Sequence, residues 1–226
     1  MHLNKTVEGS AIVAGLFLRR LLLNFKGGMI KLDNYEEISI TSNEKDYLDS
    51  IYDKLRRIKH HLNNDFNKNY LDYIDLYDYL FEIKKITGNI HNDISFIACL
   101  MVKEFLRINH NLLELDVAAK AQGASGLDID KESTDGKRII GEIKTTSPYK
   151  NNDLGSSQRK SFFKDFKKLE NNTASYKYFF VTELKTFEIV KRKYLNQIPN
   201  VKLVLLPDAI DNPDDYIVGF KDIMDF

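Results

Sequence analysis

The most constraining part of the chain is residues 138–145, an apolar run that contains one acid and one base. Its sequence is Arg-Ile-Ile-Gly-Glu-Ile-Lys-Thr, and the β-branched residues predict a strand. Side chains alternate between the faces of a strand, so Ile140, Glu142 and Lys144 share one face. A carboxylate and an ammonium are costly to cover on an otherwise apolar strand. We therefore expect this face to meet a cleft that receives a divalent metal and an anionic substrate.

Two further acids precede this strand across a predicted tight turn. Residues 134–137 contain Asp-Gly, a favoured hairpin sequence because glycine accepts positive φ. A short strand over residues 126–130 would complete the hairpin and place Asp128 or Asp130 beside Glu142. Two converging carboxylates suit Mg²⁺, which takes oxygen ligands and keeps positions for water and phosphate. A nearby lysine can then steady a metal-bound hydroxide or the scissile phosphate.

The sequence around the hairpin alternates helical and strand patterns. Helical periodicity covers residues 92–108, 156–170 and 187–195. Strand patterns cover residues 112–117, 176–182 and 201–206. Strands separated by helices imply parallel crossover connections. We therefore expect residues 92–226 to form an α/β core, a mixed β-sheet flanked by helices.

Residues 1–91 are expected to form an N-terminal helical region, because apolar residues recur at helical spacing over residues 35–88. The apolar segment 11–25 is interrupted by two arginines and is shorter than the ~20 residues that a membrane-spanning helix needs. It predicts an amphipathic helix that lies on the body of the protein. Alternatively, Met29 is the true start and residues 1–28 are an extension.

Composition narrows the class of protein. The single cysteine, Cys99, excludes an intramolecular disulfide framework and a cysteine-based zinc site, and favours a reducing, cytoplasmic setting. Lysine plus arginine and aspartate plus glutamate each number 33, so the net charge is zero. This excludes a uniformly basic nucleic-acid coat protein but allows local charge asymmetry. No phosphate-binding glycine motif is present in the sequence.

The motif Gly-Leu-Asp-Ile at residues 126–129, followed by Gly-Glu-Ile-Lys-Thr-Thr at residues 141–146, resembles the PD-(D/E)xK nuclease superfamily, particularly its type II restriction endonucleases. The resemblance covers about residues 92–206 and includes the family order of helix, three-stranded meander, helix and strand. A leucine stands before the aspartate, where the motif has proline.

The resemblance implies that Asp128 and Glu142 are metal ligands and that Lys144 is the catalytic lysine, with Mg²⁺ as the cofactor. Asp130 is a rival for the first ligand, and Asp128 is preferred because its Gly-x-Asp-Ile context fits the family better. Glu104 lies on the helix before the meander, where family members often carry an acid that contacts the metal through water. The alternative is that Glu104 is a solvated surface residue.

The predicted helix after this strand begins with polar and basic residues, among them Gln158, Arg159, Lys160 and Lys164. A helix N-terminus with flanking cations is a good phosphate site, so we expect these side chains to contact the backbone of double-stranded DNA. The alternative is that these side chains form an ordinary solvated helix face and do not contact DNA.

The sequence thus predicts a Mg²⁺-dependent endonuclease that cuts double-stranded DNA, with no membrane association. The alternatives are a structure-selective resolvase, a nuclease subunit of a defence or repair complex, and a non-catalytic DNA-binding module of the same fold. A compact enzyme with one site per chain makes double-strand breaks most simply as a symmetric homodimer. The aromatic-rich helices of residues 45–88 could provide that interface or grip the DNA.

Overall fold

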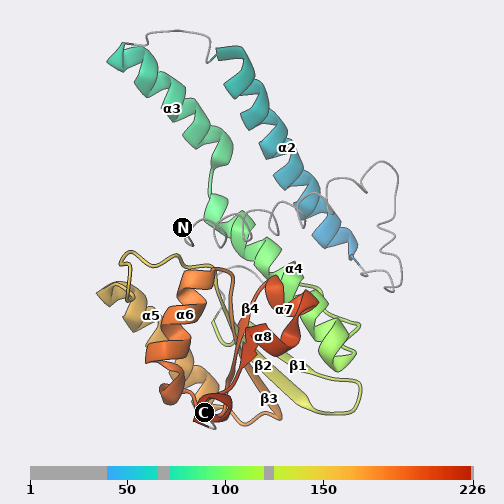
Figure 1. Cartoon of the computed structure of the whole chain (residues 1–226). Helices are drawn as coiled ribbons and strands as arrows, with labels where there is room; N and C mark the ends of the chain where they lie inside the picture. Colours follow the sequence, from blue (N-terminus) through green and yellow to red (C-terminus); the bar gives the residue numbers. More distant parts are fainter. Residues whose placement is uncertain (1–39, 66–71, 120–124, 225–226) are drawn as a thin grey trace. The chain divides into compact units, whose positions relative to one another are not determined.

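A computed structural model describes residues 40–65, 72–119 and 125–224 of the chain (Figure 1). The apolar segment 11–25 and the alternative start at Met29 lie outside these residues. The described residues belong to one compact unit. Within them, no helix combines the length and the apolar character needed to cross a membrane.

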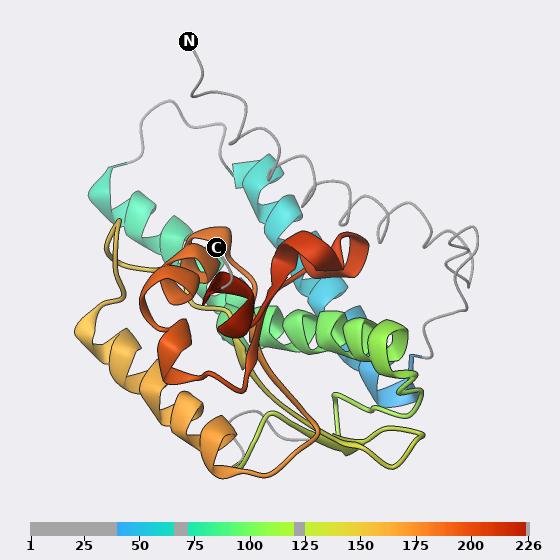
Figure 2. The ribbon, with the colours of Figure 1, turned by 60° about the horizontal axis from the view of Figure 1, so that its bottom comes forward.

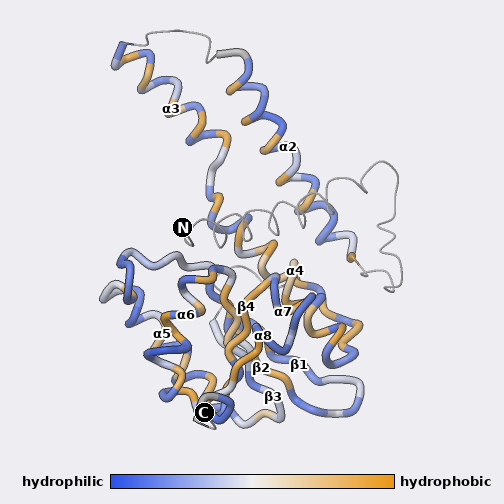
Figure 3. The backbone as a smooth tube through the Cα atoms, viewed as in Figure 1, coloured by the Kyte–Doolittle hydropathy of each residue, from blue (hydrophilic) through white to orange (hydrophobic). Residues whose placement is uncertain are grey.

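The fold is α/β, as expected, and its centre is a five-stranded mixed sheet in the order β1-β2-β3-β4-β5. The strands are β1 (Ile129–Glu132), β2 (Arg138–Lys144), β3 (Tyr176–Val181), β4 (Lys202–Leu205) and β5 (Ile217–Val218). The β1–β2 and β4–β5 pairs are antiparallel, whereas β2, β3 and β4 run parallel. Hydrophobic residues gather in the middle of the sheet (Figure 3), whereas the ends of the central strands include charged residues such as Arg138, Lys144 and Lys202.

The turn between β1 and β2 forms at the Asp-Gly sequence. Gly136 has a φ of +75°, a conformation that glycine adopts at little cost. The Ser133 amide donates to the Lys137 carbonyl at 2.9 Å, and the Gly136 amide donates to the Ser133 carbonyl at 2.9 Å. The register places Ile129 opposite Gly141 and Asp130 opposite Ile140. The hairpin was therefore predicted, although its first strand lies later in the chain than expected.

Helices cover both faces of the sheet (Figure 2). One face packs against α4 (Ile90–His110) and α7 (Asp208–Asp211), and the other packs against α5 (Ser156–Asn171) and α6 (Leu184–Lys193). Strand alternation divides the core accordingly: Tyr178 and Phe180 face α4, whereas Phe179 and Val181 face α5 and α6. The sheet therefore has a distinct chemical environment on each side.

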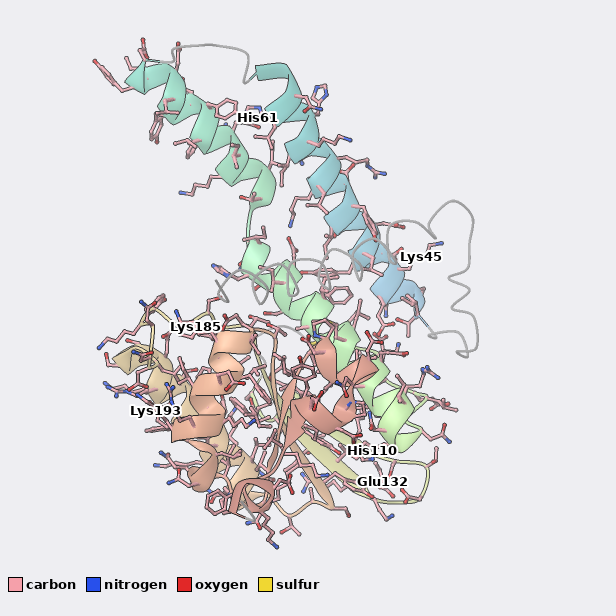
Figure 4. The ribbon with its side chains drawn as sticks, viewed as in Figure 1. Lys45, His61, His110, Glu132, Lys185 and Lys193 are labelled. Carbon is pink, nitrogen blue, oxygen red and sulfur yellow. The ribbon has the colours of Figure 1, made fainter. Side chains whose placement is uncertain are left out.

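The N-terminal part of the described chain is a helical hairpin of α2 (Ser42–Asp65) and α3 (Tyr73–Thr87). The ring of His61 on α2 points toward α3 (Figure 4) and stacks on Tyr79, with ring centroids 4.5 Å apart. The expected boundary between residues 91 and 92 falls in the first turn of α4. No chain break or linker separates the helical part from the sheet at that point, because α4 continues directly into the core.

The first turn of α2 is tied to α4 by a buried acid. Glu44 and Thr41 form a capping box: the Glu44 amide donates to Thr41 Oγ1 at 3.2 Å, and the Thr41 amide donates to Glu44 Oε2 at 2.9 Å. The Glu44 carboxylate also pairs with Lys103 Nζ at 2.7 Å and accepts from the Val117 amide at 2.9 Å. One fully buried side chain therefore connects α2, α4 and the segment that follows α4.

The strand predicted over residues 112–117 is wrong. This segment has no regular secondary structure, and its buried residues, Leu112 and Leu115, are three positions apart rather than two. Its last amides bond to side chains, the Val117 amide to Glu44 and the Ala118 amide to Asp116. The expected three-stranded meander is therefore a two-stranded hairpin.

The C-terminal elements were not predicted: α7, α8 (Pro213–Tyr216), β5 and α9 (Lys221–Met224).

Candidate active site

The carboxylate of Glu142 and the ammonium of Lys144 lie on the α5 face of β2. Ile140 belongs to the core cluster under α5 and α6, whereas Ile139 belongs to the cluster under α4. Because side chains alternate along a strand, residues 142 and 144 share the α5 face, as the sequence predicted. Glu142 is only 2% exposed, so the strand carries this acid into the interior.

Asp128 converges on Glu142 from the other side of the hairpin. It immediately precedes β1, at the position that continues the register opposite Glu142. Its Oδ2 accepts a hydrogen bond from the Ile143 amide at 2.9 Å, which fixes this carboxylate against β2. The pKa of Glu142 is raised from its ordinary value to about 7, first by burial and then by the charge of Asp128. The raised pKa reflects a carboxylate that is buried and that also has a second acid beside it.

Helix α5 adds a buried acid and a lysine that the sequence analysis did not assign to the site. Lys168 Nζ donates to Glu142 Oε1 at 2.9 Å and lies 3.2 Å from Asp165 Oδ1. Asp165 Oδ2 lies 2.5 Å from Lys144 Nζ, and Lys144 Nζ donates to Ser161 Oγ at 3.0 Å. The strand pair and the helix pair thus form a chain of alternating charges.

A signal for Asp165 was present in the sequence. Phe162, Phe166 and Leu169 are buried at helical spacing on α5, and Asp165 falls within the same stripe. A buried acid needs a charged or hydrogen-bonding partner, so an acid in an apolar stripe indicates a polar group on the element packed against it. Here that group is Lys144.

Asp130 has a different environment from Asp128. Its carboxylate accepts from Arg138 Nε at 2.8 Å and from Arg138 Nη2 at 2.7 Å. Both residues are exposed or half-buried, and the pair spans the hairpin away from Glu142. Of the two rival acids, the structure brings Asp128 to Glu142.

Glu104 lies on α4, which packs on the opposite face of the sheet from Glu142. Its carboxylate is buried and accepts from Arg107 Nε at 2.9 Å and Nη2 at 3.0 Å. It is therefore neither a solvated surface acid nor a neighbour of the Glu142 carboxylate on β2.

The residues predicted to contact DNA separate into two groups. Gln158 is buried, and its amide holds the preceding loop: Oε1 accepts from the Gly155 amide at 2.9 Å, and Nε2 donates to the Ser147 carbonyl at 2.8 Å. Arg159 Nη1 lies 3.7 Å from Asp153 Oδ2. The structure thus gives both residues partners within the chain.

Lys160 and Lys164 form the second group. Both are exposed on α5, and neither makes an ion pair with another residue of the described ranges. They remain accessible to a phosphate backbone.

A cavity of about 970 Å³ adjoins Asp128. The hairpin side of its lining includes Asp128, Ile143 and Thr145, and the opposite side includes Phe96 and Leu115. This volume lies in the range of ligand-binding cavities, about 300–1,000 Å³. Its lining belongs to the α4 side of the hairpin and does not include Glu142 or Lys144, so the cavity adjoins the two-carboxylate site only through Asp128.

Asp128 and Glu142 could supply two oxygen ligands to a hard cation. Across the described residues, no group of three or more His, Cys, Asp or Glu side chains is arranged to hold a metal ion. Mg²⁺ is often held by only one or two carboxylates together with waters and substrate phosphates. The two convergent acids therefore fit this ion better than one that needs a closed cage of side chains.

No family model, curated protein or solved structure matches the chain. The resemblance to PD-(D/E)xK nucleases therefore depends on the motif at residues 126–129 and 141–146 and on its setting in a mixed sheet.

Proposed function

We propose that the protein is a Mg²⁺-dependent endonuclease of the PD-(D/E)xK type, similar to type II restriction endonucleases. The observation that carries this proposal is the convergence of Asp128 and Glu142 across one hairpin, with Lys144 on the same face of β2. In this reading Asp128 and Glu142 hold the metal, and bound Mg²⁺ supplies charge neutralisation and a more acidic water at the scissile phosphate.

Lys144 has the role of steadying the attacking water or the scissile phosphate. Its Nζ lies 2.5 Å from Asp165 and donates to Ser161, so two groups on α5 fix the position of the ammonium. A positioned cation stabilises the negative charge that develops on the phosphate in the transition state.

The exposed lysines of α5 are proposed to bind the backbone of double-stranded DNA. Lys160 and Lys164 belong to the same helix that holds Asp165 and Lys168 at the site. Phosphate contacts on this helix would therefore set the distance between the duplex and the metal ligands. Phosphate contacts position a nuclease without reading sequence. We place the enzyme in the cytoplasm, in keeping with its single cysteine.

A homodimer through the helical hairpin completes the proposal. Helix α3 exposes large apolar side chains, and Tyr73 and Tyr77 are 83% and 64% accessible. Leu76, Leu80 and Phe81 on the same helix are exposed as well. An apolar patch of this kind is typical of protein interfaces, and a two-fold dimer would present one active site to each strand.

Cleavage of a supercoiled plasmid tests the enzyme activity. We expect linear product with Mg²⁺ and none with EDTA, and we expect no cleavage by Asp128→Ala or Glu142→Ala. Asp130→Ala is the matched control, because it removes an acid of the same hairpin whose partner is Arg138. Retained activity in Asp128→Ala with loss in Asp130→Ala would reverse the ligand assignment.

Assays with other DNA substrates separate the alternative functions. Discrete fragments from a long duplex indicate a restriction-type enzyme, whereas cleavage confined to branched DNA indicates a resolvase. DNA binding without cleavage in any divalent metal would make the protein a non-catalytic DNA-binding module.

A further inference from the structure

We infer that Lys168 is a positioning residue that fixes both metal ligands before the metal binds. This inference rests on the proposed metal-dependent function. It concerns a lysine of α5 that lies outside the sequence motif, and its basis is the set of three oxygen atoms around one ammonium group.

The ammonium of Lys168 joins three separate elements. It donates to Glu142 Oε1 at 2.9 Å on β2 and to the Gly126 carbonyl at 3.0 Å, and it lies 3.2 Å from Asp165 Oδ1 on α5. A lysine has three donors, and these three acceptors match them. The side chain therefore has one defined position rather than a range of solvated ones.

The contact with Gly126 extends this control to the second ligand. Gly126 lies two residues before Asp128 and has a φ of +102°, a conformation that L side chains rarely adopt. Its carbonyl is held by Lys168, so the turn that carries Asp128 is attached to the strand that carries Glu142. One side chain thus sets the separation of the two carboxylates.

Each carboxylate uses one oxygen in a hydrogen bond to the protein and leaves the other available. Glu142 Oε1 accepts from Lys168, and Asp128 Oδ2 accepts from the Ile143 amide. Within the described residues, Glu142 Oε2 and Asp128 Oδ1 accept no hydrogen bond. Partners of this kind orient metal ligands, and their removal typically costs about 10–100-fold in metal affinity.

A different role for Lys168 makes the opposite prediction. If its ammonium stood in the place of the metal, binding would require its displacement, and removal of the lysine would strengthen metal binding. The geometry favours positioning, because Lys168 contacts only one oxygen of Glu142 and makes no hydrogen bond or ion pair with Asp128 in the described structure.

Calorimetric titration of the full-length protein with Mn²⁺, in the absence of DNA, measures the metal affinity and tests the inference. We expect Lys168→Met to weaken Mn²⁺ binding by about tenfold or more, and Lys168→Arg to recover part of this loss because it retains charge and donors. The matched control is Lys167→Met, which removes an exposed lysine from the preceding position of α5; its Mn²⁺ affinity should equal that of the wild type.

Equal or tighter binding by Lys168→Met would overturn the inference, and so would failure of Lys168→Arg to bind better than Lys168→Met. Circular dichroism checks the fold of each variant, and Lys168→Gln replaces the methionine variant if that one does not fold. Absence of Mn²⁺ binding by the wild type would instead refute the proposed function, so the two failures are distinguishable.

Discussion

Glu142→Gln should stabilise the protein at pH 8, although it removes a proposed metal ligand. The pKa of Glu142 is raised from 4.5 to about 7 by burial and by the charge of Asp128, despite the bond from Lys168. One pKa unit corresponds to about 1.4 kcal/mol. Ionised Glu142 therefore lowers the free energy of unfolding by about 2 to 3 kcal/mol, after allowance for screening by water beside the exposed Asp128.

The pH window follows from the direction of this shift. Below about pH 4.5 both states hold the proton, and Glu142 has no effect on the free energy of unfolding. Between about 4.5 and 7 the unfolded chain loses the proton while the folded protein keeps it, so stability falls as the pH rises. Above pH 7 the full destabilisation is present. Glutamine has no charge to desolvate and can still accept from Lys168.

Urea unfolding in EDTA, at pH 4.5 and at pH 8, measures the effect. We expect the variant and the wild type to agree at pH 4.5, and the variant to be more stable by about 2 to 3 kcal/mol at pH 8. Glu132→Gln is the matched control, because Glu132 is an exposed acid on the same hairpin (Figure 4). A Glu142→Gln variant that is no more stable than the wild type at pH 8 would refute the reasoning, since Lys168 would then compensate the buried charge fully.

Three further predictions concern the sheet, the proposed DNA contacts and the proposed dimer. Gly141→Ala should destabilise the fold by about 1–3 kcal/mol in urea unfolding, because the new Cβ would lie 3.0 Å from Phe180 Cε2; an unchanged midpoint would mean that the Phe180 ring moves aside easily. Lys160→Ala and Lys164→Ala should each weaken binding to all duplexes alike, and each should lower by about one the slope of the logarithm of the DNA-binding constant against the logarithm of salt concentration. An unchanged slope would mean that these lysines do not contact DNA phosphates. Light scattering at micromolar concentration, with and without DNA, should give the mass of a dimer; a monomer in both conditions would contradict an interface on α3.

The sequence predicted those parts of the site that depend on local geometry. Alternation along one strand was enough to place Glu142 and Lys144 together on one face, and the Asp-Gly turn set the partner strand. The preference for Asp128 over Asp130 came from its motif, and the structure supplies a physical difference between them: Asp130 is paired with Arg138.

The parts that were missed depend on tertiary packing. The contacts of Lys168 with Glu142 and of Asp165 with Lys144 are set by how α5 lies on β2, and residue spacing within either element does not determine that. The weak alternation of residues 112–117 was misleading because the segment packs through Leu112 and Leu115 and bonds to side chains. A strand as short as β5, with two residues, depends on its neighbour more than on its own propensity.

The buried pair of Glu44 and Lys103 determines where the chain can be shortened. A fragment that begins at residue 92 retains Lys103, whose side chain is only 5% exposed, but lacks the carboxylate that neutralises it. Removal of one partner from a buried ion pair costs about 3–5 kcal/mol, a large fraction of the roughly 5–15 kcal/mol that stabilises a typical domain. The same fragment also loses the acceptor for the Val117 amide. We therefore expect a fragment that begins at Thr41 to be more stable than one that begins at residue 92, so a study of the β-sheet core should keep the helical hairpin.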